Sequence, residues 1–283
     1  MRQRRRLLVI ESRRVKRLSY PYIVWMAIFV IVPLLIVCYY GFSDRDGNFT
    51  LEYVKSIASP VHWKALLLSV KLSLISTLIC FLLSLPLAMV IRSLRLNSSG
   101  FIIFIFILPM WMNFLLRTIA WQSLLEKTGI INTILHAVGL PGQSLINTEG
   151  AIILGMVYNY LPFMVLPIYN SLVKVSQDTF DAAKDLGANW FQILCHITLP
   201  QIFPGIVSGI TMVFVPAMTT FVISNLLGGA KINLIGNIIE QEFTTANNWY
   251  QGAGLSIVLM VLVLGSMAVM SRYDKDGEGA AIW

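Results

Sequence analysis

The chain has 283 residues, of which 57% are hydrophobic and 12% are charged, whereas about 25% are charged in an ordinary soluble domain. Its mean hydropathy is +0.74 and its formal net charge is +7. So little polar surface does not cover a water-soluble globule, which excludes a soluble enzyme, a disordered tail and a nucleic-acid-binding domain. The excess apolar surface is predicted to face lipid.

Six stretches of the chain are long and apolar enough to cross a membrane, since a helical span needs roughly 20 apolar residues. In chain order, we expect the spans at 18–43, 72–91, 96–116, 150–173, 206–227 and 243–271. The predicted fold class is therefore all-α integral membrane, with both termini on one side. We divide the chain into a basic N-terminal segment (1–19), a six-span domain (20–271) that contains a loop at 174–204, and a tail (272–283).

The distribution of Lys and Arg predicts which side of the membrane each loop faces. Fourteen of the 21 lie in the N-terminal segment, the second and fourth loops and the tail, whereas five lie in the other loops. By the positive-inside rule, both termini and the 174–204 loop are predicted to be cytoplasmic. The net positive charge is thus a topology signal, and the basic N-terminal segment is expected to contact anionic headgroups.

The predicted spans contain no Asp or Glu. A proton-coupled secondary transporter usually carries an intramembrane carboxylate or histidine relay, so its absence argues against that class. Two cations, Lys71 and Arg117, lie within or at the edge of spans. We expect each to lie near the outer interface, where it either reaches the headgroups or pairs with an external acid.

Proline and glycine residues mark several predicted spans. Each proline removes a helical hydrogen bond, and these positions indicate either moving parts or the higher frequency of proline in membrane helices. Gly205 and Gly209 form a GxxxG pair, which is predicted to let another helix approach closely. The prolines are Pro33, Pro86, Pro109, Pro162, Pro167 and Pro216.

The 174–204 loop carries the most informative pattern. Residues 178–186 combine good helix formers with acids in the first turn, which suit the helix dipole, and Gly187 is predicted to stop this helix. A second amphipathic stretch, 190–199, is expected to end at Pro200. The sequence therefore predicts two short helices at an angle on the cytoplasmic face.

Within this loop, Asp-Ala-Ala is followed after three residues by Gly, and after nine more by Ile-x-Leu-Pro. This spacing resembles the EAA loop of ABC-importer permeases, with Asp in place of the usual Glu. The resemblance implies a coupling helix that inserts into a cleft of a cytoplasmic ATPase subunit. The alternative is a plain amphipathic surface helix. The residues that the resemblance assigns to ATPase coupling are Asp181, Ala182, Ala183, Gly187, Ile197, Leu199 and Pro200.

The sequence contains no motif for catalysis. It has no Gly-Lys dipeptide, and therefore no Walker A loop to hold ATP phosphates. It also has no H-E-x-x-H and no G-x-S-x-G motif. The chain is predicted not to be an enzyme and to hold neither a metal nor a cofactor, and ATP and Mg²⁺ are expected on a separate ATPase subunit.

Four further segments, 108–113, 161–169, 227–231 and 235–239, narrow the family. They resemble spermidine/putrescine importer permeases of the PotB type, and the similarity runs from about 21 to 270. The resemblance implies a type I ABC importer permease (MetI-like) fold in the bacterial cell membrane. It also implies a second, PotC-like permease subunit, a homodimeric ABC ATPase and an external polyamine-binding protein as partners.

A polyamine that crosses these spans would meet aromatic faces and amides instead of acids. A cation–π contact is worth about 0.5–2 kcal/mol, which suits transient contact more than tight capture. The alternative for each aromatic side chain is ordinary packing or exposure to lipid. The candidate path residues are Trp111, Asn113, Tyr158, Asn159, Tyr160, Phe221 and Asn225.

The predicted external loops carry acids that are candidates for docking the binding protein. These are Asp44, Asp46, Glu240 and Glu242, and the alternative for each is an ordinary solvated loop position. The sequence as a whole predicts a permease subunit of a polyamine ABC importer. The same machine carrying a metal ion, thiamine or an amino acid is the nearer alternative. A stand-alone channel or secondary transporter is the more distant one.

Overall fold

The computed structural model describes residues 20–93 and 108–273, which are helical apart from loops and one isolated bridge between Ser43 and Phe49. The α-helices are α2 (Val32–Phe42), α3 (Glu52–Lys55), α4 (Pro60–Ser93), α6 (Phe114–Leu125), α7 (Ile130–Ala137), α8 (Glu149–Lys174), α9 (Gln177–Asp185), α10 (Trp190–Ile193), α11 (Leu199–Gln201), α12 (Phe203–Thr219), α13 (Val222–Leu227), α14 (Ile235–Thr244) and α15 (Trp249–Ser271). Turns of π-helix lie at Ala27–Ile31 and Leu194–Thr198, and 3₁₀ turns at Ser56–Ala58, Leu108–Trp111 and Gly229–Lys231.

In the described part of the chain, four helices are long and apolar enough to cross a membrane: Tyr20–Phe42, α4, α8 and α15. A fifth span results if Trp190–Gln201 and Phe203–Thr219, which meet at 70°, are counted as one bent helix. The segment 1–19, most of the expected third span (96–116) and most of the tail (272–283) lie outside the described residues.

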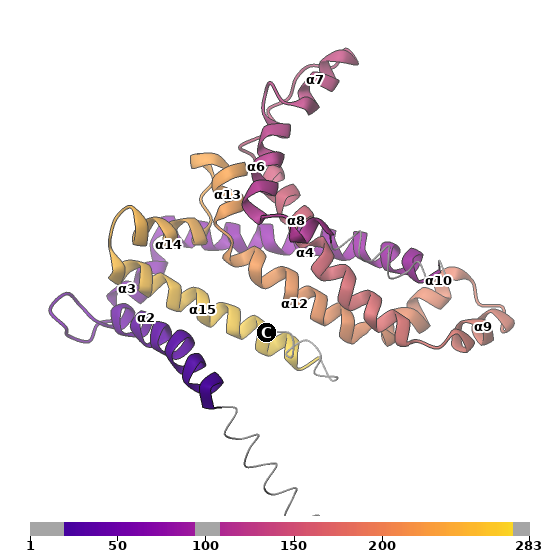
Figure 1. Ribbon diagram of the computed structural model, residues 1–283, viewed down its shortest axis with the longest axis horizontal. Coiled ribbons are helices and arrows are strands. Elements are labelled where there is room, and N and C mark those ends of the chain that lie inside the picture. The colour runs from indigo at the N-terminus through magenta and orange to yellow at the C-terminus, as the bar shows by residue number, and fades with distance from the viewer. Residues whose placement is uncertain (1–19, 94–107, 274–283) are drawn as a thin grey trace, which may run out of the picture. The chain divides into compact units, whose positions relative to one another are not determined.

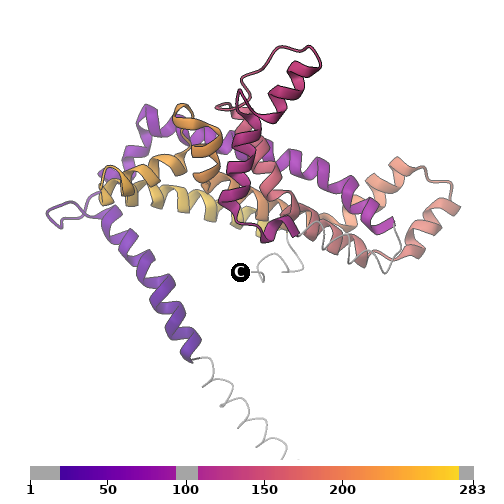
Figure 2. The same cartoon turned by 45° about the horizontal axis from the view of Figure 1, so that its top comes forward.

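The chain divides into two compact units, and the larger comprises residues 58–241 and 259–283. Its core is formed by α4, α8 and α12, which lie side by side in both views (Figure 1, Figure 2). The buried face of α4 is rich in small hydroxyl residues, and Ser69, Ser73 and Thr77 each donate to the carbonyl four residues earlier. Each of these hydroxyls therefore places its proton within its own helix, and the oxygen of Ser69 also accepts from the backbone N–H of Ile235.

Helix α12 approaches α8 closely at the predicted GxxxG pair. A Cβ atom at Gly205 would lie 2.6 Å from the carbonyl oxygen of Pro167, and one at Gly209 would lie 2.6 Å from Sδ of Met164. Real Cβ atoms do not approach other atoms so closely. Glycine is therefore required at Gly205, where the close atom belongs to the backbone, whereas at Gly209 the backbone of Met164 lies at 3.3 Å and its flexible side chain is the close neighbour.

The two cations in the spans have different surroundings. Nζ of Lys71 lies 2.7 Å from Oε2 of Glu149, so one of the two expected outcomes, pairing with an acid, is found for Lys71. Arg117 is only 8% exposed, and its Nε has no hydrogen-bond partner among the described residues. The expectation that Arg117 pairs with an acid or extends away from the protein is therefore wrong, because α6 holds it inside.

Several helix boundaries differ from the sequence expectation. Helix α4 begins at Pro60 instead of residue 72, and α6 begins at Phe114, inside the predicted span 96–116. The predicted span 206–227 is broken, because α12 ends at Thr219 and Thr220 has an extended backbone. The helix predicted to end at Pro200 continues to Gln201. A π-helical turn at Leu194–Thr198 precedes the proline, and the backbone N–H of Leu199 donates to the carbonyl of Leu194 there. The last span begins at Trp249 instead of residue 243.

The smaller unit comprises residues 1–57 and 242–258, and aromatic rings hold its elements together. The ring of Tyr40 lies 5.2 Å from that of Tyr250, which in turn lies 5.7 Å from that of Tyr53. The amide of Gln251 donates to the hydroxyl of Ser56. These contacts join the end of α2 and the α3 region to the start of α15.

The close approach of α12 to α8 generates a stability prediction. Gly205→Ala places a methyl group against the backbone of α8, and overpacking of this kind costs about 1–3 kcal/mol. Gly265→Ala in α15 is the matched control, because nothing lies within 4 Å of its Cβ position. We expect a lower melting temperature for the purified protein in detergent with Gly205→Ala and no decrease with Gly265→Ala. Equal melting temperatures for the two variants would contradict the packing described here.

Candidate functional site

The 174–204 loop begins with a well-capped helix. Ser176 is the N-cap of α9, and its hydroxyl accepts from the backbone N–H of Thr179. At the other end, Gly187 has a φ of +78°, a conformation that suits glycine, and its N–H donates to the carbonyl of Lys184 at 2.8 Å. The predicted first helix and its glycine stop are confirmed, with bounds shifted by one residue.

A second helical stretch returns the chain to α12. Asn189 and Gln192 form a capping box in which each side chain accepts from the other residue's backbone N–H. Helix α10, the π-helical turn and α11 follow, and the 70° bend leads into α12. The predicted coupling residues Ile197 and Leu199 are half-buried in this stretch, whereas Pro200 is exposed. The loop is thus two helical pieces joined by a tight turn.

The residues of α9 that the sequence predicts for ATPase coupling do not all face outward. Ala182 is exposed, but Ala183 is only 7% exposed and packs inside this chain. Asp181 is exposed, accepts from Nε2 of Gln177, and lies 3.5 Å from Nζ of Lys184. Ala182 and Asp181 are therefore available to a partner protein, whereas Ala183 is used within the loop.

The turn between the two helical pieces exposes apolar side chains that the sequence analysis did not single out. Leu186 is 89% exposed, and Trp190 and Phe191 are also mostly exposed. One feature of the sequence could have indicated this exposed leucine, because an apolar residue stands directly before Gly187, where the helix stops. An exposed apolar tip of this kind marks a protein interaction site or a membrane surface.

Three of the candidate path residues are consecutive in α8. Tyr158 packs edge-on against Trp121 of α6, with ring centroids 5.3 Å apart. The hydroxyl of Tyr160 donates to the carbonyl of Pro216 in α12 at 3.4 Å. Asn159 is only 1% exposed, and its Oδ1 has no hydrogen-bond partner among the described residues. A buried acceptor without a partner is uncommon, and this one is the clearest polar anomaly in the described spans.

Phe221 and Asn225 lie at the break after α12, where Asn237 holds both of them. Nδ2 of Asn237 donates to the carbonyl of Phe221 at 3.1 Å and to Oδ1 of Asn225 at 2.5 Å. Its Oδ1 accepts from the hydroxyl of Ser224 and the N–H of Leu234. Asn237 is fully buried, and the sequence analysis quoted its segment without recognising this role.

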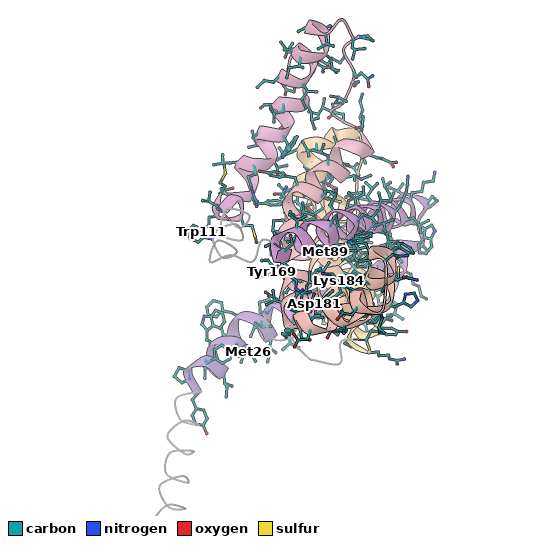
Figure 3. The ribbon with its side chains drawn as sticks, turned by 90° about the vertical axis from the view of Figure 1, so that its right-hand side faces the viewer. Met26, Met89, Trp111, Tyr169, Asp181 and Lys184 are labelled. Atoms are coloured by element: carbon teal, nitrogen blue, oxygen red, sulfur yellow. The ribbon has the colours of Figure 1, made fainter. Side chains whose placement is uncertain are left out.

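The remaining two path candidates have other surroundings. Trp111 is 75% exposed, and Figure 3 shows it apart from Asp181 and Lys184 of the coupling loop. The side chain of Asn113 caps α6 by accepting from the N–H groups of Leu115 and Leu116. Asn113 therefore has a structural task that does not depend on any path.

The four acids predicted to dock a binding protein occupy two kinds of element. Asp44 and Asp46 lie in the tight turn between the bridge residues Ser43 and Phe49. Glu240 and Glu242 lie in α14, and all except Asp46 are half-buried. None of the four takes part in the coupling loop.

Comparison with known proteins identifies relatives across almost the whole chain. Residues 9–275 match the family model described as binding-protein-dependent transport system inner membrane component. The PotB permease protein of the spermidine/putrescine transport system of Haemophilus influenzae is 38% identical over 259 residues, covering 89% of this chain and 91% of the relative. The PotB protein of Escherichia coli K12 is 35% identical over 254 residues, covering 87% and 92%.

Solved structures share the fold at lower identity. A chain of a bacterial ABC transporter that imports the acidic polysaccharide alginate has a TM-score of 0.79 and 19% identity, covering 95% of this chain and all of that one. A chain of the methionine transporter MetNI has a TM-score of 0.55 and 19% identity, covering 76% and 96%. The predicted ABC importer permease fold is therefore confirmed, and the chain belongs to the family of binding-protein-dependent transport system inner membrane components.

Proposed function

We propose that this chain is a transmembrane permease subunit of an ATP-driven importer for the polyamines spermidine and putrescine. The observation that carries the proposal is identity of 35% or more with two PotB proteins over nearly the full length of each. The structural relatives at 19% identity support the fold alone. The proposed solute rests on the similarity to the PotB proteins. The chain itself has no ATP-binding motif, so ATP and Mg²⁺ belong to a separate ATPase subunit.

The proposed topology has six spans and two cytoplasmic termini in the bacterial cell membrane. The candidate spans of the described residues, together with the expected span at 96–116, support this number. The concentration of Lys and Arg in the N-terminal segment supports the orientation. In this arrangement, the proposed partners are a PotC-like permease beside the chain, an ATPase dimer at the 174–204 loop and a polyamine-binding protein on the opposite side.

The proposed coupling mechanism uses α9 as the contact with the ATPase. Closure of the ATPase dimer on ATP pushes α9, which carries exposed Asp181 and Ala182 and is followed directly by exposed Leu186. Because α9 directly follows α8, and α10 and α11 lead into α12, a displacement of this loop acts on two core helices. The spans then alternate between inward-facing and outward-facing arrangements.

The proposed solute path passes the unpartnered amide oxygen of Asn159. Polyamines carry ammonium groups that donate hydrogen bonds, and a buried acceptor without a partner offers one site of contact. The aromatic face of Tyr158 adds a cation–π contact. Contacts of this strength let a polyamine move through the path. We therefore expect the external binding protein to provide the tight binding of the polyamine.

The function is tested in proteoliposomes that contain this chain, the PotC-like permease, the ATPase and the binding protein. We expect ATP-dependent uptake of labelled spermidine or putrescine, and ATPase activity that rises when the binding protein is loaded. Stimulation by a metal ion, thiamine or an amino acid, and by neither polyamine, would assign another solute. Solute flux without any ATPase would indicate a channel or secondary transporter instead.

The exposed position of Ala182 predicts a size-dependent loss of coupling. Ala182→Phe fills the surface through which a partner approaches α9, so we expect polyamine uptake to fall strongly while the melting temperature stays unchanged. Ala182→Ser keeps the small side chain and is expected to transport normally. Full uptake by Ala182→Phe would count against α9 as the ATPase contact.

The unpartnered oxygen of Asn159 predicts loss of transport without loss of stability. Asn159→Leu keeps the number of side-chain heavy atoms, removes the unpartnered Oδ1 and gives up the hydrogen bond from Nδ2 to the carbonyl of Gly155 in the same helix, so the melting temperature should change little. Hydrogen bonds to charged groups contribute about 1.5–3 kcal/mol, so uptake should fall by about tenfold or more.

Asn132→Leu is the matched control for this experiment. Asn132 is also buried, but its amide makes three hydrogen bonds, to Glu126 and Gln143. The control variant should therefore lose thermal stability. Normal uptake by Asn159→Leu would exclude Asn159 from the path.

A further inference from the structure

Arg92 joins three elements at the end of the bundle where the 174–204 loop lies. It is in the last turn of α4, and its Nη2 donates to the carbonyl of Val175 at 2.6 Å. The centre of its guanidinium lies 4.2 Å from the centroid of the Phe180 ring. Val175 is the residue at which α8 ends, and Phe180 is in the middle of α9. One side chain thus connects α4 with both the end of α8 and the helix that follows.

The chemistry of this contact requires an arginine. The guanidinium is planar, so it donates to a carbonyl in its own plane while its face lies on an aromatic ring. The Val175 carbonyl comes just after the last turn of α8, where backbone oxygens lack helical partners and attract positive charge. An ammonium group at this position would make the hydrogen bond and lose the flat contact with Phe180.

The space beside Arg92 is incompletely filled. A cavity of about 340 Å³ lies between the end of α4, the end of α8 and the two pieces of the loop, and Arg92 and Phe180 are among its lining residues. Met89 and Lys184 also line it, and Lys184 lies beside Asp181 (Figure 3). At this position Arg92 connects α4 to α9, and the cavity beside it interrupts the packing between the two helices.

The opposite part of α4 reaches the break that follows α12. The hydroxyl of Ser69 accepts from the backbone N–H of Ile235 at 2.9 Å, next to the Leu234–Asn237 hydrogen bond. Ser69 and Arg92 are on one continuous helix, 23 positions or roughly 35 Å apart, with Pro86 between them. The continuous backbone of α4 connects the two contacts.

We propose that Arg92 is a positioning residue that makes α4 move with the coupling loop. This inference rests on the proposed function, in which the ATPase displaces α9. When α9 moves, the hydrogen bond to Val175 and the stacking on Phe180 carry the end of α4 with it. Helix α4 delivers the displacement to the Ser69 contact, where Asn237 holds the candidate path residues Phe221 and Asn225.

The first test measures transport and ATP hydrolysis in the same reconstituted complex. Arg92→Met keeps an unbranched, largely apolar stem and removes the guanidinium and with it both contacts, and we expect uptake to fall about tenfold while ATP hydrolysis continues. Arg92→Lys should be intermediate, and Phe180→Leu should act in the same direction. In the double variant, Arg92→Met with Phe180→Leu, the fold-decrease in uptake should be smaller than the product of the two single fold-decreases, because both substitutions act on one contact.

Ser93→Ala is the matched control. Ser93 lines the same cavity, but its hydroxyl bonds only to the carbonyl of Val90 in its own helix, so normal uptake is expected. Full uptake by Arg92→Met would overturn the inference. Parallel loss of uptake and ATPase activity, with weaker binding of the ATPase, would overturn it too, because Arg92 would then only shape the docking surface.

A second test is independent of the solute. Spin labels at Ser93→Cys and Asp178→Cys, in a protein whose native cysteines are replaced, report the distance between the end of α4 and α9. We expect one narrow distance distribution with and without ATP, and a broader one when Arg92→Met is added. An unchanged distribution in that variant overturns the role of Arg92. If the intact complex takes up no polyamine while the distances behave as expected, the proposed solute fails and the Arg92 contact stands.

Discussion

Every backbone polar group inside a membrane must find a partner within the protein, and this constraint explains the interior of the larger unit. The chain breaks α12 at Thr220 and still satisfies the exposed backbone there. The carbonyl of Phe221, just after the break, accepts from the N–H of Asn225 and from the amide of Asn237. Because the same Asn237 side chain also accepts from the N–H of Leu234, it ties the segment after the break to the segment before α14.

The same constraint selects small hydroxyl and glycine residues where the core helices meet. The hydroxyls of Ser69, Ser73 and Thr77 bond within α4, which leaves its buried face smooth. Gly205 lets the backbone of α12 lie against α8. Since apolar side chains gain little by leaving lipid, this close backbone contact supplies the attraction that holds the three helices together.

Local signals in the sequence predicted the loop well and the long-range polar contacts poorly. The ends of α9 follow from Ser176 and Gly187, which act within a few residues of where they stand. The break at Thr220 was missed because it lies in a long charge-free stretch, and because the Asn237 side chain that bonds the carbonyl of Phe221 is distant in the sequence. Arg117 was expected at an interface and is buried, because no local pattern says which face of α6 packs inward. The sequence also did not predict that Ala182 is exposed and Ala183 is buried, because this depends on which face of α9 packs against the rest of the protein.

The two ends of the larger unit differ in how firmly they are held, and this difference bears on how a push is transmitted. At the Asn237 end, four hydrogen bonds converge on one buried amide. At the loop end, α9 lies beside a cavity and contacts α4 through Arg92. A loosely packed end can be displaced at small cost, whereas a network of satisfied bonds moves only as a unit. Helix α4 carries a contact at each of these two ends, at Ser69 and at Arg92, and the proposed role of Arg92 rests on this arrangement.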